Sequence, residues 1–99
     1  MPLRLDLNNE IFQYQWFRLE KDERHAVLAA CVKLASLSWE QLYADKGFRW
    51  ELIHSRRDLD GAKLHSIRIT KKIRAVVKRS GDFLEVLTLH PDHDSAYRN

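Results

Sequence analysis

The fold of this chain is decided by the stretch Leu64-His-Ser-Ile-Arg-Ile-Thr-Lys-Lys-Ile-Arg-Ala-Val-Val77. Within it, Ile67 and Ile69 alternate with polar residues, which is the period of a strand with one buried face and one polar face. Strand-forming residues resume at Ile73 after a short loop, and so short a connection favours antiparallel neighbours. We therefore predict a β-hairpin made of residues 64–70 and 73–78.

Two more strands are predicted, one on each side of this hairpin. Residues 48–53 and 83–89 are rich in apolar residues, and turn signals separate them from the hairpin: Asp58-Leu-Asp-Gly61 before it and Ser80-Gly-Asp82 after it. Because all three connections are short, we expect the four strands to form an antiparallel meander.

The first half of the chain has the periodicity of helices. Asp22 is the expected N-cap of a helix that ends near Ser36, since the apolar residues after it repeat with helical spacing: Val27, Leu28, Cys31, Leu34 and Ala35. Ser38 and Gln41 have the spacing of a capping box, which predicts a second, short helix over residues 39–45. We expect the two helices to form an α-hairpin.

The residues before these helices contain alternating aromatic side chains. They predict a half-buried strand over residues 12–16, carried by Phe12, Tyr14 and Trp16. Neighbouring Ile11 and Phe17 leave the start of a helix as the alternative. The predicted fold is then α+β in a single domain, residues 1–99: an N-terminal strand, an α-hairpin and an antiparallel β-meander.

Composition excludes several classes of protein. The chain has 99 residues, of which 44% are hydrophobic and 31% charged, values that match neither a disordered chain nor a membrane protein. No run of 18 apolar residues occurs, and the N-terminus lacks the pattern of a secretory signal. We therefore expect a cytoplasmic protein that does not interact with membranes. Cys31 is alone among apolar residues and is expected to fill the core.

Basic residues are concentrated between residues 56 and 79. The net charge of the whole chain is only +3, but the acids of this segment are limited to Asp58 and Asp60. Against them stand many cations: Arg56, Arg57, Lys63, Arg68, Lys71, Lys72, Arg74, Lys78 and Arg79. Such clustering is the electrostatic footprint of a phosphate-binding surface, with a solvated sheet face as the alternative.

Two of these cations are predicted to lie side by side. If residues 70–72 form the hairpin loop, Arg68 and Arg74 become cross-strand partners on the polar face of the sheet. Like charges placed opposite each other destabilise a sheet. The pairing therefore indicates a bound anion or a nearby carboxylate.

A polar cluster follows the last predicted strand, in residues 90–97. Pro91 ends the strand and leaves His90 at its terminus, while His93 follows among aspartates that can orient imidazoles. Imidazoles titrate near neutral pH, which suits proton transfer. Three interpretations stay open: an acid/base or phosphate-handling role, ordinary capping with Tyr97 docked on the sheet, and a metal site. The metal site is the weakest, because a non-helical segment fixes no ligand spacing.

Several segments of the second half share their pattern with a known family: Gly61-x-x-Leu-His-Ser-Ile-Arg-Ile69, Ile73-Arg-Ala-Val-Val77, Leu87-x-Leu-His90 and the closing Tyr97. With them the chain resembles the RelE/ParE superfamily of toxins from bacterial toxin–antitoxin pairs, over about residues 20–97. The resemblance implies an α-hairpin before an antiparallel sheet and a cognate antitoxin that covers the basic face. It also implies either ribosome-dependent cleavage of mRNA or non-catalytic inhibition of DNA gyrase.

The resemblance further implies roles for individual residues. Arg74 matches the sheet arginine that stabilises charge on the scissile phosphate, and Tyr97 matches the C-terminal tyrosine that stacks on or orients the RNA. His90 or His93 stands where other members place a histidine or arginine. Supporting phosphate contacts are expected from Arg68, Lys71, Lys72 and Lys78.

From these observations we expect an RNA endonuclease that uses the 2′-hydroxyl of its substrate and needs no metal or cofactor. Gyrase inhibition is the alternative. The aromatic residues around residue 45 are assigned to the core or to an antitoxin-facing surface: Trp39, Tyr43, Phe48 and Trp50. The remaining histidines are assigned to ordinary surface or core positions: His25, His54 and His65.

Overall fold

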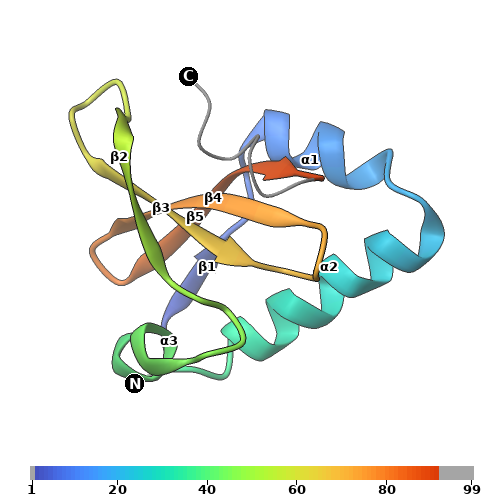
Figure 1. Cartoon of the computed structure of the whole chain (residues 1–99), viewed down its shortest axis with the longest axis horizontal. Coiled ribbons are helices and arrows are strands. Elements are labelled where there is room, and N and C mark those ends of the chain that lie inside the picture. The colour runs from blue at the N-terminus through green and yellow to red at the C-terminus, as the bar shows by residue number, and fades with distance from the viewer. Residues whose placement is uncertain (1, 92–99) are drawn as a thin grey trace.

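A five-stranded sheet in the order β1-β5-β4-β3-β2 forms the centre of the structure (Figure 1). The computed structural model describes residues 2–91. The strands are β1 (Arg4–Asp6), β2 (Glu51–Arg57), β3 (Lys63–Arg68), β4 (Arg74–Ser80) and β5 (Phe83–His90). The helices are α1 (Glu10–Phe17), α2 (Lys21–Leu34) and α3 (Trp39–Ala44). The α+β class predicted from the sequence is confirmed.

The predicted meander is confirmed, but the sheet is mixed and not purely antiparallel. Strands β2 to β5 are antiparallel neighbours in chain order. Strand β1 adds to the free edge of β5 in the parallel direction, with Arg4 opposite Phe83 and Asp6 opposite Glu85. Strand β1 was not predicted, because a strand of three residues is too short to show a periodicity.

The strand predicted over residues 12–16 is wrong, because these residues lie in helix α1. Asn9 caps the helix: its Oδ1 accepts hydrogen bonds from the backbone amides of Ile11 and Phe12, at 2.9 and 3.2 Å. Phe12 and Trp16 are one helical turn apart and stack at 5.5 Å, whereas the Tyr14 between them is 58% exposed. The alternation of aromatics therefore reflects an i, i+4 pair plus one surface residue.

The other two helices form close to the predicted positions. The capping box of α3 is confirmed, since Ser38 and Gln41 exchange hydrogen bonds of 2.8 and 3.1 Å. Helix α2 begins at Lys21, with Glu20 in place of the predicted Asp22 at the N-cap. Helix α1 packs against α2. The indole Nε1 of Trp16 in α1 donates a hydrogen bond to the carbonyl of Arg24 in α2 at 3.1 Å.

The hydrophobic core lies between the helices and one face of the sheet. Each helix contributes to it, through residues such as Phe12, Val27, Leu34 and Leu42. A smaller apolar cluster covers part of the other face: Ile53, Leu64, Val76 and Leu87. Cys31 is buried as predicted, and burial raises the pKa of its thiol. Within residues 2–91, no helix is both long and apolar enough to cross a bilayer.

Candidate nucleic-acid interface

Three of the predicted site residues lie next to one another across three adjacent strands. Arg68 of β3 is opposite Arg74 of β4, and Arg74 is opposite His90 of β5. Their chain neighbours Ile67, Ala75 and Leu89 belong to the helix-side core. Because side chains alternate along a strand, we expect the three residues to share the sheet face opposite this core. Arg68 also borders a hollow beside α2, and His90 borders one beside α1. We call this set the arginine–histidine row.

The arginines of the row are not equally accessible. Arg74 is only 8% exposed, whereas Arg68 is half-buried. The guanidinium of Arg74 donates through Nη1 to the carbonyl of Thr70 at 3.3 Å, which ties it to the hairpin loop. A charge that is so little exposed to water interacts strongly with any anion that reaches it.

The loop beside the row holds two lysines at the surface. The Oγ1 atom of Thr70 accepts hydrogen bonds from the backbone amides of Lys72 and Ile73, at 3.1 and 3.0 Å. The predicted short loop therefore forms, and both Lys71 and Lys72 are exposed. They lie at the end of the sheet to which Arg68 and Arg74 belong.

Two of the contacts at the end of β5 involve His90 and its neighbour Leu89. The Nε2 of His90 is 2.8 Å from the Oγ1 of Thr88, two residues earlier on the same face. Helix α1 supports this end of β5, because Oε1 of Gln15 accepts a hydrogen bond from the backbone amide of Leu89 at 2.7 Å. The imidazole is thus oriented by a neighbouring hydroxyl. The predicted site residues His93 and Tyr97 lie outside the described residues.

Lys78, the remaining predicted phosphate contact, is occupied by carboxylates. Its Nζ is 2.5 Å from Asp58 and 3.4 Å from both Asp60 and Glu85, and its side chain is 14% exposed. The hydrogen bond to Asp58 is the main cause that raises the pKa of Lys78, and it lowers the pKa of Asp58. Lys78 therefore adds no free positive charge to the sheet, and the arrangement is that of a structural ion cluster.

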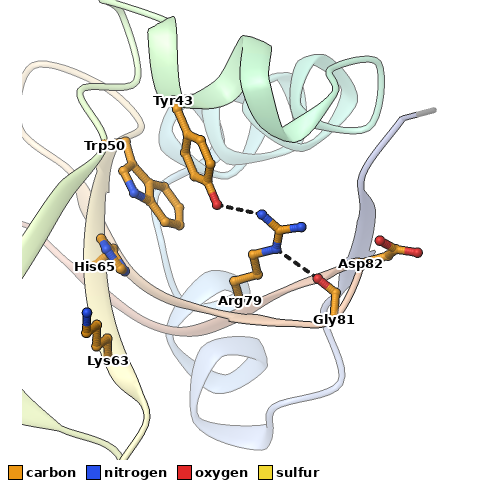
Figure 2. A pocket seen from close by; sticks show the side chains of 7 residues that line it. All are labelled: Tyr43, Trp50, Lys63, His65, Arg79, Gly81 and Asp82. Carbon is orange, nitrogen blue, oxygen red and sulfur yellow. Dashed lines mark hydrogen bonds between the residues drawn. The ribbon is translucent and has the colours of Figure 1, made fainter.

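A second candidate site lies on the helix side of the sheet, where α3 faces the β4–β5 turn (Figure 2). It is a hollow of about 570 Å³ that we call the aromatic–basic pocket: Tyr43, Trp50, Lys63, His65, Arg79, Gly81 and Asp82. Arg79 is fixed within it. Its Nη1 donates to the hydroxyl of Tyr43 at 2.7 Å, and its Nε donates to the carbonyl of Gly81 at 2.9 Å.

The aromatic wall of this pocket includes a stacked pair. The rings of Trp50 and His65 lie 4.3 Å apart and 21° from parallel, and Tyr43 is 5.2 Å from Trp50. Nδ1 of His65 is buried and has no hydrogen-bond partner within the described part of the chain. Burial lowers the pKa of His65, and the charges of Lys63 and Arg57 lower it further. The imidazole is therefore neutral at neutral pH.

Sequence reasoning did not find the aromatic–basic pocket. The aromatics were assigned to the core or to an antitoxin-facing surface, and His65 to an ordinary surface or core position. One signal was available: Arg79 is two residues from the inward-facing Val77, so strand alternation places both on the helix side. Nothing local indicates that α3 brings Tyr43 to Arg79, 36 residues apart in the chain.

Comparisons with known proteins give no further guidance. No model of a protein family matches the chain, and neither a curated protein nor a solved structure matches it. Among residues 2–91, no group of three or more His, Cys, Asp or Glu side chains is placed to hold a metal ion. Function is therefore inferred from the arginine–histidine row and the aromatic–basic pocket.

Proposed function

We propose that this chain is the toxin of a bacterial toxin–antitoxin pair with a RelE/ParE-like fold, and that it cleaves mRNA on the ribosome. The observation that carries the proposal is the arginine–histidine row. It combines two cations for a phosphate with an imidazole that can move a proton, in register across three adjacent strands. Those are the parts that cleavage of RNA by its own 2′-hydroxyl requires.

In this proposal the row grips the scissile phosphate. Arg74 meets the phosphate where water is largely excluded, and the half-buried Arg68 contacts it from the neighbouring strand. The exposed Lys71 and Lys72 contact flanking phosphates.

The reaction then proceeds without a metal. His90 accepts the proton of the 2′-hydroxyl, whose oxygen bonds to phosphorus, and the bond from phosphorus to the 5′-oxygen breaks. A general acid returns a proton to that leaving oxygen, and His93 or Tyr97 fills this role in the proposal. The products are a 2′,3′-cyclic phosphate and a free 5′-hydroxyl.

Typical magnitudes for such groups indicate which residues matter most. A general base contributes about 10²- to 10⁴-fold in rate. A preorganised donor to a developing charge contributes about 10²- to 10³-fold. Arg74 and His90 are therefore expected to dominate the activity, whereas exposed lysines mainly affect affinity. A cognate antitoxin that covers this face would silence the enzyme in the cytoplasm.

Growth arrest and RNA mapping test the proposal together. The full chain, Arg74→Ala and His90→Ala are expressed from a tightly controlled promoter, and mRNA ends are mapped in the arrested cells. We expect the natural sequence to arrest growth and to generate new 5′-hydroxyl ends within coding regions. Both variants are expected to lose arrest and cleavage. Lys21→Ala, on the exposed first turn of α2, serves as the control and retains both.

The same experiment identifies the alternative function. A toxin that inhibits gyrase by binding alone would not need the imidazole. Growth arrest by His90→Ala together with intact mRNA would therefore overturn the nuclease proposal in favour of a binding toxin. Folding of each variant is checked by its thermal unfolding curve, because Arg74 is nearly buried.

A further inference from the structure

We propose that the aromatic–basic pocket binds one nucleotide of single-stranded RNA, with the base on the aromatic wall and the phosphate between Lys63 and Arg79. The inference rests on the proposed function in one respect, namely that RNA is the substrate. It adds a second contact point for that RNA, away from the scissile phosphate.

The charges of the pocket suit a phosphate. Lys63 and Arg79 are exposed, and within the described residues neither forms an ion pair with a carboxylate. Arg79 is held by Nε and Nη1, so the pocket has a preorganised guanidinium whose Nη2 takes no part in those two bonds. Figure 2 shows the carboxylate of Asp82 beyond Gly81, away from Lys63 and His65.

The aromatic wall suits a base. Tyr43 is 46% exposed, and the stacked Trp50 and His65 are half-buried, so ring surface is accessible in a hollow of about 570 Å³. The neutral imidazole of His65 adds a flat, uncharged ring. Stacking of a base on such side chains is worth about 1–3 kcal/mol and depends little on sequence. An acidic peptide would satisfy the cations but would leave this wall unused, which is why RNA is favoured.

The pocket is separate from the arginine–histidine row. Arg74 is the first residue of β4, whereas Arg79 is near its end, about 16 Å further along at strand geometry. The two also lie on opposite faces, because the guanidinium of Arg79 lies 4.2 Å from the Trp39 ring of the helix side. Loss of one site should therefore leave the other intact.

NMR of the tryptophan indole groups in the purified full chain tests the inference. Uridine monophosphate is expected to shift the Trp50 indole signal, with a smaller effect from uridine and the smallest from inorganic phosphate. Trp16 provides an internal control, because its indole is bonded to Arg24 between α1 and α2. Equal shifts at Trp16 and Trp50, or none at Trp50, would overturn the inference.

Charge reversal supplies the matched variants. For a short single-stranded RNA, Lys63→Glu is expected to weaken binding about fivefold or more and to reduce the salt dependence of log K by about one unit. Lys21→Glu makes the same change in net charge on an exposed residue of α2, and it should leave affinity nearly unchanged. Equal losses in both variants would show a general charge effect and no pocket.

The outcomes separate this inference from the proposed function. A Trp50 shift caused by the nucleotide, together with no RNA cleavage by the natural sequence, would support the pocket and reject the nuclease. Cleavage that requires Arg74, with a Trp50 indole signal that the nucleotide does not shift, would support the nuclease and overturn the pocket inference. A Trp50 shift caused by a polyglutamate peptide and not by the nucleotide would assign the pocket to a protein partner and overturn the inference.

Discussion

The two ends of β4 hold their cations in opposite ways. At its start, Arg74 is nearly buried and lies in a row whose members are fixed by strand register. Near its end, Arg79 is exposed and fixed by an aromatic ring, a phenol hydroxyl and a backbone carbonyl. The first arrangement follows from local pairing, and the second depends on where helix α3 packs. Register and tertiary packing thus build two different cationic sites on one strand.

Adjacent residues of this strand illustrate how little a charge count reveals. Lys78 and Arg79 are neighbours in the sequence, yet alternation sends them to opposite faces. Lys78 is surrounded by three carboxylates, whereas Arg79 reaches an open pocket. The basic segment between residues 56 and 79 is therefore divided by the fold into neutralised and available charges.

The largest expected difference between the two ends concerns the chemical step. Arg74→Lys keeps the charge but loses the planar fork, so we expect the rate of RNA cleavage at saturating substrate to fall about 10²- to 10³-fold. Arg79→Lys, at the other end, is expected to weaken RNA binding but to change this rate by less than about twofold, because the pocket lies far from the reacting atoms. Single-turnover cleavage of a short RNA measures both. Similar losses would show that the row is not the reaction centre.

The next difference concerns stability. Lys78→Ala leaves Asp58, Asp60 and Glu85 close together without their cation, and we expect a loss of about 1–3 kcal/mol in the free energy of unfolding. The partial exposure of these carboxylates keeps the estimate below that for a fully buried pair. Urea unfolding measures it, with the exposed Lys72→Ala as control at less than about 0.5 kcal/mol. Equal stability of the two variants would show that Lys78 is not structural.

Much of the first site could be predicted from the sequence, because strand pairing obeys local rules. The short loop at residues 70–72 sets the register that pairs Arg68 with Arg74. Pro91 marks the end of the last strand, which places His90 opposite Arg74. The capping box at Ser38 and Gln41 likewise specified α3 from neighbouring residues alone.

The features that could not be predicted depend on distant parts of the chain. Residues 12–16 alternate like a strand, but the Asn9 cap and the Phe12–Trp16 pair make them a helix that supports the end of β5. Strand β1 is too short to show a pattern. The pocket combines residues from α3, β3 and β4, and no local signal connects them.

A smaller effect is expected at the end of the sheet that holds the row. Gln15→Ala removes the acceptor of the Leu89 amide, and we expect a loss of about 1 kcal/mol. Because this contact anchors the strand next to His90, hydrogen exchange at Leu89 should accelerate, while the amide of Leu84, where β1 pairs with β5, stays protected. Unchanged exchange at Leu89 would show that α1 does not hold the strand end.

The smallest expected effect is a pH dependence that belongs to the pocket end. The pKa of His65 is lowered in the folded chain, mainly by burial, so the unfolded chain binds more protons as the pH falls through about 6.5. The contribution of His65 to the free energy of unfolding should therefore be constant above that pH and decrease below it. In His65→Gln this part of the decrease should be absent.

The lowered pKa values of Asp45 and Asp58 act in a separate pH window, because their contributions to stability disappear only below their ordinary value of 3.8. Urea unfolding at pH 7.5 and 5.5 measures the difference, and parallel pH profiles of the two proteins would show that the imidazole is not held neutral in the pocket.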